Sequence, residues 1–306
     1  MATILVATDK PFASSALEKI RKVITKAGHN FELLESYNSR EQLLAAVQNA
    51  DALIVRSDVI DAGVLSAAPQ LKIVVRAGAG YDTIDAAAAG KMGIVVMNTP
   101  GQNANAVAEL AVGLAIYGVR ELYSGKTGGE LRGRTIGLHG FGFVARNVFR
   151  IARALGMKVI VYTRFSREAA AAIGLKVAHS LEDLYRKSDV VSIHVPAKGE
   201  HLKSVSYPVL ENLRTNAIIV NTARREVVNE EDLIRFMQER KDVKYLTDIE
   251  PEKKELFREQ FPGRYYSTPK KLGAQTLEAN TNAGVAAAEQ IVEFFRTGDT
   301  TFQVNA

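Results

Sequence analysis

The sequence has no cysteine, and that absence excludes several kinds of site at once. Without thiols the chain forms no disulfide, binds no zinc or iron–sulfur cluster through thiolates and has no cysteine nucleophile. Long apolar runs are missing too, since the longest, residues 107–119, is interrupted by Glu109 and is too short to span a bilayer. The first residues lack the basic and apolar regions of a signal peptide. The sequence therefore predicts a cytoplasmic protein without a membrane partner.

Basic residues are in slight excess but do not gather into a stripe. The 39 Lys and Arg residues and the 34 Asp and Glu residues give a formal net charge of +5 at pH 7. Because the two signs are interspersed, no nucleic-acid partner is predicted. A small excess of positive charge suits a small anionic substrate, although a solvated basic surface explains it equally well. His139 and His194 lack metal-ligand neighbours, so no metal site is predicted.

Short β-branched runs alternate with longer segments of helical period along the chain. One such series begins at residue 3 and ends with residues 94–97, and a second begins at residue 135. This alternation is typical of parallel sheets covered by helices, and 306 residues at about 100–200 per domain predict two domains. We therefore expect an α/β protein with two doubly wound parallel-sheet domains.

Two long segments set the expected domain boundaries. Residues 103–122 are apolar on most faces, which predicts a buried helix that bridges the domains. A last helix at about residues 286–296 follows the second series and is expected to fold back onto the first domain. The predicted domains are residues 1–100 with 275–306, which bind substrate, and residues 101–274, which bind a dinucleotide.

A glycine-rich motif follows the first predicted strand of the second series. Residues 135–138 read as a strand, and GFGFVA at residues 140–145 leads into a helical pattern. Gly140 permits a tight turn, Gly142 lets the backbone approach a pyrophosphate, and the small Ala145 allows close helix packing. We therefore predict dinucleotide binding by Gly140, Gly142, Phe143 and Val144; the alternative is a plain glycine turn.

The next predicted strand, residues 158–162, ends without the carboxylate that NAD-binding proteins place there to bind the ribose hydroxyls. The residues that follow include Thr163, Arg164, Ser166 and Arg167. Two guanidinium groups can bind a 2′-phosphate, and no acid repels it. We therefore predict that these four residues bind NADPH in preference to NADH. The alternative is that both arginines belong to the solvated start of a helix.

Several further motifs occur in order around this loop. They are Val55-Arg56-Ser57, RAGAGYD at 76–82, NTPGQN at 98–103, Val107-Ala108-Glu109, IVNTARREVVNEED at 219–232 and Thr268-Pro269. With these motifs the sequence resembles the D-isomer-specific 2-hydroxyacid dehydrogenases over nearly its whole length. It is most similar to the phosphoglycerate dehydrogenases of that family, in a short form with lysine in place of the catalytic histidine. The resemblance implies a Rossmann-type nucleotide domain and a flavodoxin-like substrate domain.

The resemblance also implies which residues perform the reaction. Arg224 matches the catalytic arginine, whose guanidinium holds the substrate carboxylate and polarises the ketone. Lys270 stands where the family has its general-acid histidine, so we expect Lys270 to donate the proton, with oxidation favoured at alkaline pH. The alternative is an exposed loop lysine and no catalysis. Glu250 is either the glutamate that partners the histidine, displaced by three residues, or a turn residue.

The remaining site residues follow from the same resemblance. On the cofactor side they are His194, Val195, Pro196, Thr222, Ala223 and Asp248. On the substrate side they are Arg56, Ser57, Arg76, Ala77, Gly78, Ala79, Asn103 and Lys271. Arg76 is equally well explained as an ion-pair partner, and His194 as a structural histidine. A homodimer formed through the nucleotide-binding domain is also expected.

The function expected from these features is hydride transfer between a nicotinamide cofactor, NADP or else NAD, and the pair 3-phosphohydroxypyruvate and 3-phosphoglycerate, which feeds serine synthesis. One alternative is an NADPH-dependent reductase of hydroxypyruvate or glyoxylate. An alternative of another class is a nucleotide-sensing binding protein without catalysis, which the substitution of the histidine would permit.

Overall fold

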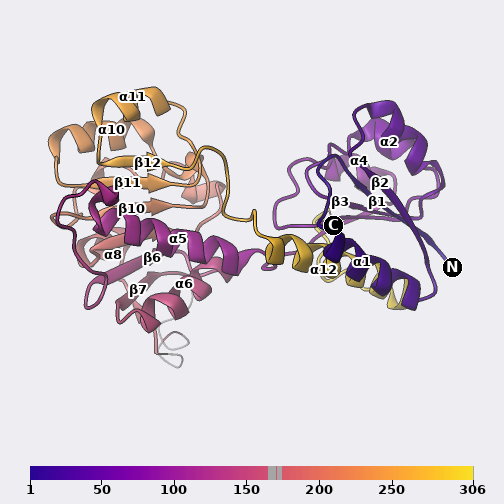
Figure 1. Cartoon of the computed structure of the whole chain (residues 1–306), viewed down its shortest axis with the longest axis horizontal. Coiled ribbons are helices and arrows are strands. Elements are labelled where there is room, and N and C mark those ends of the chain that lie inside the picture. The colour runs from indigo at the N-terminus through magenta and orange to yellow at the C-terminus, as the bar shows by residue number, and fades with distance from the viewer. Residues whose placement is uncertain (165–169, 171–173, 306) are drawn as a thin grey trace. The chain divides into compact units, whose positions relative to one another are not determined.

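The computed structural model describes residues 1–164, 170 and 174–305. The chain forms two compact units, one made of Met1–Asn103 with Thr276–Ala306 and the other of Ala104–Gln275 (Figure 1). Each unit contains one parallel sheet covered by helices, of five strands in the first and seven in the second. This confirms the predicted fold class.

The sheet of the first unit has the strand order β2-β1-β3-β4-β5, which is the flavodoxin-like order. Its strands are β1 (Thr3–Thr8), β2 (Asn30–Glu35), β3 (Ala52–Val55), β4 (Ile73–Arg76) and β5 (Val95–Asn98). The central strand β3 is apolar throughout because helices cover both faces of the sheet, and every residue of β3 is buried.

Two long helices, α1 (Ser14–Lys26) and α12 (Leu277–Thr297), pack against each other on one face of this sheet (Figure 1). The helices α2 (Arg40–Ala46), α3 (Ala62–Ser66) and α4 (Ala86–Lys91) cover the other face. The prediction that α12 begins at about residue 286 is wrong. Thr276 caps the helix by accepting a hydrogen bond from the Ala279 amide, and Gly298 ends it in the left-handed conformation.

The sheet of the second unit has the order β12-β11-β10-β9-β6-β7-β8. Its strands are β6 (Thr135–His139), β7 (Lys158–Tyr162), β8 (Lys176–Val177), β9 (Val190–Ile193), β10 (Ile218–Asn221), β11 (Lys244–Thr247) and β12 (Tyr265–Ser267). This is the Rossmann order with one added strand, and the direction of winding reverses between β6 and β9. Ligands of such sheets bind at the carboxyl ends of the strands near that reversal.

Helices α5 (Ala104–Val119) and α6 (Phe143–Ala154) pack together on one face of this sheet (Figure 1). The other face is covered by α8 (Leu181–Lys187), α9 (Tyr207–Leu210), α10 (Glu230–Glu239) and α11 (Lys254–Gln260). Short 3₁₀ turns follow β9 and β10, namely η3 (Gly199–His201) and η4 (Arg225–Val227). Within the described part of the chain, no helix is both long and apolar enough to cross a membrane.

The first helix of this unit is shorter than the apolar pattern of residues 103–122 predicts. It ends at Val119, and residues 121–123 have positive φ angles between 53° and 55°. The Gly129 amide donates to the carbonyl of Val119, and a Cβ on Gly128 would lie 2.7 Å from the Cα of Arg120. The returning chain therefore occupies the space that another helical turn needs.

Candidate active site

The glycine motif forms a loop between β6 and α6. Gly140 has φ +98°, and a Cβ there would lie 2.8 Å from the carbonyl oxygen of His194, so this position requires glycine. A Cβ on Gly142 would meet nothing within 4 Å. Among the described residues no side chain caps α6, and its first turn carries no acid. Open space before uncapped amides at a helix N-terminus fits a bound pyrophosphate.

The segment after β9 lies against this loop. The His194 amide donates to the carbonyl of His139 at 2.8 Å, and Val195 and the exposed Pro196 follow. The side-chain atoms His139 Nδ1 and His194 Nε2 are buried, and neither has a hydrogen-bond partner in the described structure. Burial lowers the pKa of His139 to about 4 and that of His194 to about 3. Both rings are therefore neutral at pH 7.

Arg164 follows β7 and forms an ion pair that the sequence does not indicate. Its Nη2 donates to Oε1 of Glu200 in η3 at 2.5 Å, with both side chains largely exposed. The carboxylate expected after β7 is absent from residues 163–167, but Glu200 brings one to the same place from 36 positions further along the chain. The predicted contacts Ser166 and Arg167 lie outside the described residues.

The segment Thr222, Ala223 and Arg224 leaves the carboxyl end of β10 and is shaped by Asn221. The Asn221 side chain donates from Nδ2 to the Arg224 carbonyl and accepts the Ala223 amide at Oδ1, both at 3.0 Å. The half-buried Arg224 donates from Nη1 to the Ala223 carbonyl at 2.9 Å. Thr222 Oγ1 is buried, with no hydrogen-bond partner in the described structure. Asn221 thus fixes the backbone that carries the predicted catalytic arginine.

Asp248 follows β11 and organises the loop that carries the predicted general acid. The residue is 1% exposed. Oδ1 accepts the Thr268 hydroxyl at 2.8 Å and the Leu272 amide at 2.7 Å, while Oδ2 accepts the Gly273 amide at 2.8 Å. Both ends of the loop are therefore tied to one carboxylate, with Lys270 between them.

Lys270 and Lys271 are both exposed on this loop. In the described part of the chain, Lys270 makes no hydrogen bond or ion pair. Glu250 lies in a different environment, since it pairs with Lys254 at 2.9 Å and Arg258 at 2.6 Å. The hydrogen bond from Lys254 is the largest cause that lowers the pKa of Glu250. Arg224 and Lys270 thus follow β10 and β12 at one edge of the sheet, whereas Glu250 is engaged by α11.

Arg56, at the end of β3 in the first unit, is held by its surroundings. Its Nη1 donates to the carbonyls of Lys10 at 2.7 Å and Pro11 at 3.0 Å, and its Nη2 donates to Oδ1 of Asn280 at 2.7 Å. The guanidinium also lies 4.9 Å from the centroid of the Phe12 ring. Burial lowers the pKa of this group. Arg56 is therefore a fixed, partly desolvated cation.

The neighbouring segment, Arg76, Ala77, Gly78 and Ala79, follows β4. Arg76 donates from Nε to the Arg56 carbonyl at 2.9 Å. Gly78 has φ +150°, and a Cβ there would lie 1.4 Å from Nη1 of Arg76, so the arginine folds over a position that only glycine can occupy. Ser57 is exposed, with its Oγ 3.5 Å from Oδ1 of Asp9, and Asn103 is half-buried.

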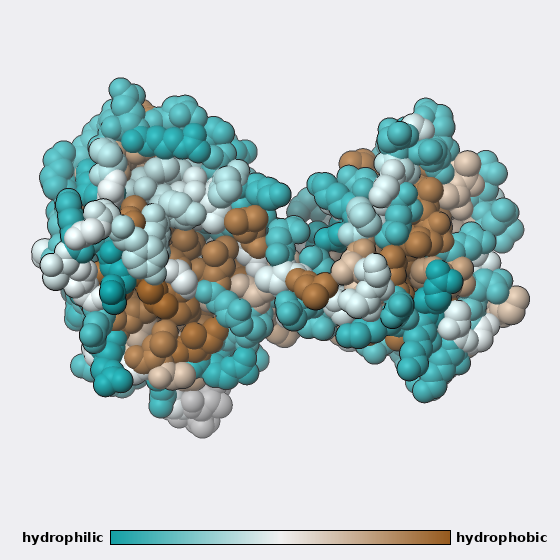
Figure 2. Space-filling model, viewed as in Figure 1, coloured by the Kyte–Doolittle hydropathy of each residue, from teal (hydrophilic) through white to brown (hydrophobic). Residues whose placement is uncertain are grey.

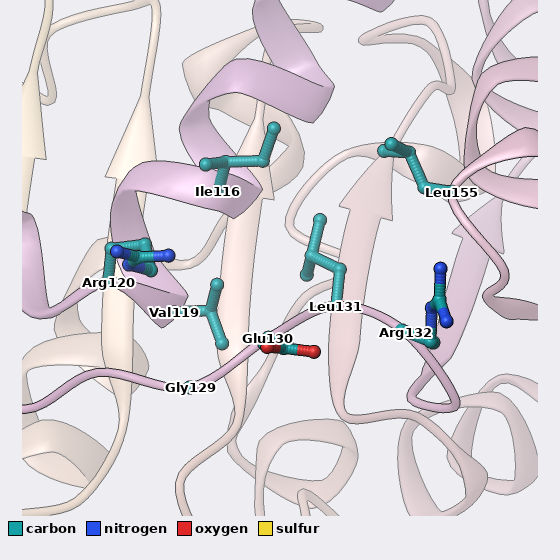
Figure 3. A pocket seen from close by; sticks show the side chains of 8 residues that line it. All are labelled: Ile116, Val119, Arg120, Gly129, Glu130, Leu131, Arg132 and Leu155. Atoms are coloured by element: carbon teal, nitrogen blue, oxygen red, sulfur yellow. The ribbon is translucent and has the colours of Figure 1, made fainter.

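A small pocket lies elsewhere in the second unit (Figure 3). It has a volume of about 250 Å³ and is lined by Ile116, Val119, Arg120, Gly129, Glu130, Leu131, Arg132 and Leu155. These residues come from the C-terminal part of α5, the segment before β6 and the residue after α6. The pocket is therefore at the amino end of β6, at the edge opposite the glycine loop. Within the described residues, no group of His, Asp and Glu side chains has an arrangement that could hold a metal.

Comparisons with known proteins agree with this architecture. The model of the family described as D-isomer specific 2-hydroxyacid dehydrogenase, catalytic domain, matches residues 5–305. A D-3-phosphoglycerate dehydrogenase of Archaeoglobus fulgidus is 34% identical over 94% of this chain and 56% of its own length. The chain thus spans about half the length of such curated relatives.

Two other similar proteins are covered almost completely. A hydroxypyruvate reductase of Thermotoga maritima is 34% identical over 85% of this chain and 90% of its own length. The crystal structure of a 3-phosphoglycerate dehydrogenase from Entamoeba histolytica with bound NAD⁺ is 43% identical, with a TM-score of 0.88 over 100% of this chain and 99% of that one.

Proposed function

Because the chain belongs to the D-isomer specific 2-hydroxyacid dehydrogenase family, we propose that it interconverts 3-phosphohydroxypyruvate and 3-phospho-D-glycerate with a nicotinamide cofactor. The observation that carries this proposal is that three segments follow strands of one parallel sheet and therefore lie at its carboxyl edge. These are the open glycine loop after β6, the segment with Arg224 after β10 and the loop with Lys270 after β12. The product would feed serine synthesis.

The proposed chemistry divides between two cations. When bound, the nicotinamide ring supplies the hydride that reduces the ketone. The fixed fork of Arg224 binds the substrate carboxylate and polarises the carbonyl oxygen. Lys270 donates a proton to that oxygen as negative charge develops on it. In the reverse direction, the neutral amine of Lys270 removes the proton from the hydroxyl.

Substrate recognition is proposed to involve residues of the first unit. Arg56 supports this role because three of its five N–H groups have protein partners, which leaves donors for an anion. Ser57 would add a hydroxyl donor and Ala79 an amide donor. The amides of Ala77 and Gly78 donate to the carbonyls of Val55 and Arg76, both at 2.8 Å, so these two residues would contribute backbone shape instead. Arg76, Asn103 and Lys271 are proposed as further contacts. Glu250 is a weaker candidate for catalysis, because Lys254 and Arg258 already bind its carboxylate.

The family uses a nicotinamide cofactor, and we propose NADPH as the preferred form with NADH as the alternative. Arg164 and the absence of an acid at residues 163–167 support NADPH. The Entamoeba protein, which was solved with NAD⁺, supports the alternative. Asp248 is proposed to act through the loop that it holds, since it is buried and its carboxylate accepts three hydrogen bonds from that loop.

We also propose a homodimer formed through the second unit. Figure 2 shows apolar side chains gathered on the face of this unit over α5 and α6. They include the partly buried Leu110, Ile116, Tyr117, Phe149 and Ile151 and the exposed Leu155. A contiguous apolar patch of this kind is typical of interaction sites. The cytoplasmic location and the absence of nucleic-acid and membrane partners stay predictions.

A reductase of hydroxypyruvate is the second candidate function, and it is favoured by the similarity to the Thermotoga protein over most of its length. Both candidates are tested by following NADPH and NADH oxidation with 3-phosphohydroxypyruvate and with hydroxypyruvate. We expect the higher kcat/KM with the phosphorylated substrate. A higher value with hydroxypyruvate would support the second candidate. Nucleotide binding without reduction of either substrate would support a nucleotide-sensing protein.

The role of Lys270 is tested by Lys270→Ala, with Lys253→Ala on the same unit as the control. We expect the first variant to lose at least about a hundredfold in kcat, the usual contribution of a positioned acid, while it still binds the nucleotide. Near-normal turnover of Lys270→Ala would exclude Lys270 as the acid.

A further inference from the structure

The further inference concerns Glu200 and rests on the proposed nucleotide-binding function. Glu200 lies in η3 after β9, and Arg164 follows β7. In the sheet, β9 and β7 are the two neighbours of β6. The ion pair between Arg164 and Glu200 therefore joins the two loops that flank the glycine loop. It lies on the adenosine side of the proposed cofactor site, where such folds recognise the ribose.

The charge of the side chains beside the ribose affects whether NADH or NADPH binds more tightly. A carboxylate accepts hydrogen bonds from the ribose hydroxyls of NADH and repels the 2′-phosphate of NADPH, whereas a free guanidinium attracts that phosphate. Here Oε1 of Glu200 accepts from Arg164, and this hydrogen bond lowers the pKa of Glu200. The carboxylate is therefore charged at neutral pH, and it neutralises the arginine that would bind the phosphate.

We propose that Glu200 is a cofactor-specificity residue that reduces, without reversing, the proposed preference for NADPH over NADH. A 2′-phosphate must displace this carboxylate from Arg164 and overcome its repulsion, while a 2′-hydroxyl has neither cost. Glu200 thus supplies, from the loop after β9, the negative charge that other dinucleotide-binding folds place at the end of the second strand.

The exposure of the two side chains to solvent determines how large a change in nucleotide affinity is expected. The side chains of Arg164 and Glu200 are 81% and 68% exposed. Water screens such pairs, so each interaction is weak. Glu200→Gln removes one negative charge with little change of shape, because the two side chains have nearly the same size. The neighbouring residues Lys198 and His201 are unchanged in this variant. We expect a change of about three- to tenfold in relative affinity, which decreases as salt is added.

The experiment is a titration of the full chain with NADPH and with NADH at low salt, followed by nicotinamide fluorescence. In Glu200→Gln we expect the Kd of NADPH to fall by about three- to tenfold and that of NADH to change by less than about twofold. In Arg164→Gln we expect the reverse, a weaker binding of NADPH. The control is Glu255→Gln, since Glu255 forms an exposed ion pair with Arg258 at 3.0 Å in the same unit.

Two results would overturn the proposal. The first is an unchanged ratio of the two Kd values in Glu200→Gln, whether neither value changes or both change by the same factor. The second is the same change of that ratio in Glu255→Gln. These results leave the proposed function intact, because both nucleotides would still bind. Wild-type protein that binds neither nucleotide would contradict the proposed function and, with it, the role of Glu200.

Discussion

The Gly273 amide donates a hydrogen bond to Oδ2 of Asp248 at 2.8 Å, 25 positions back along the chain. A Cβ on Gly273 would lie 2.9 Å from the same oxygen, so the backbone can approach the carboxylate this closely only without a side chain. With the Thr268 hydroxyl on Oδ1, this contact closes the loop that contains Lys270. The position of the proposed acid thus depends on a buried residue that points away from solvent.

Replacing Asp248 with asparagine tests this dependence. The NH₂ group of the asparagine would face an N–H or O–H donor of the loop, and that donor would lose its acceptor. An unsatisfied buried donor costs about 1–3 kcal/mol in the free energy of unfolding. We expect that loss in denaturant unfolding of Asp248→Asn, together with a lower kcat. The control is Glu255→Gln, which removes a charge from an exposed pair with Arg258 in the same unit. If kcat and stability of the first variant match those of the control, Asp248 does not hold the loop.

Alanine substitutions of the two glycines in the loop after β6 are expected to affect different properties, one the affinity for the nucleotide and the other the stability of the protein. Gly142→Ala adds a methyl group to open space, so stability is retained, but the methyl occupies the place proposed for the pyrophosphate and nucleotide binding weakens. Gly140→Ala strains a φ of +98° and is expected to destabilise the protein by about 1–3 kcal/mol. Thermal unfolding and nucleotide titration measure the two effects. Unchanged nucleotide affinity in Gly142→Ala would contradict the assignment of the loop.

Two glycines of α5 are expected to respond in opposite directions to alanine. A Cβ on Gly118 would lie 2.5 Å from Cδ1 of Leu246 and 3.1 Å from two atoms of Ile218, because the helix rests closely on β10 and β11. Gly118→Ala should lower the free energy of unfolding by about 1–3 kcal/mol through overpacking. Gly113 is exposed with nothing within 4 Å, so Gly113→Ala should raise it by about 0.5–1 kcal/mol. Denaturant unfolding checks both signs.

The buried His139 is expected to make stability fall in mild acid. Burial lowers its pKa from 6.5 to about 4. Below pH 6.5 the unfolded chain binds a proton that the folded protein rejects until about pH 4, so the free energy of unfolding decreases as pH falls through this window. The slope from this group reaches about 1.4 kcal/mol per pH unit.

The measurement is denaturant unfolding at pH 7 and pH 5 for wild type, His139→Gln and the exposed control His179→Gln. Loss of the titrating ring should make the first variant less sensitive to pH than wild type, while the control keeps the wild-type difference. An equal pH dependence in all three proteins would show that His139 does not contribute. His194 shifts in the same direction, so part of the dependence should persist.

The features that the sequence predicts correctly depend on residues close together in the chain. Alternating β-branched runs and helical segments are sufficient to predict two parallel sheets, because a strand and the helix after it bury each other's apolar faces. The two boundary errors have different causes. The apolar pattern predicts that α5 continues through residues 120–122, but Gly128 and Gly129 return against its end. The pattern places the start of α12 too late because the residues that follow its cap, Thr276, have mixed polarity.

The glycine loop, Arg224 and Lys270 could be proposed as site residues from the sequence, because each belongs to a short motif that follows a predicted strand. Only the tertiary structure showed which distant residues contact Arg164 and the loop that contains Lys270. Glu200 reaches Arg164, and Asp248 holds residues 268–273, because the strand order of the sheet brings together loops that are 36 and about 25 positions apart in the chain. Electrostatic and hydrogen-bonding contacts act over a few ångströms in space, and spacing along a sequence does not record them.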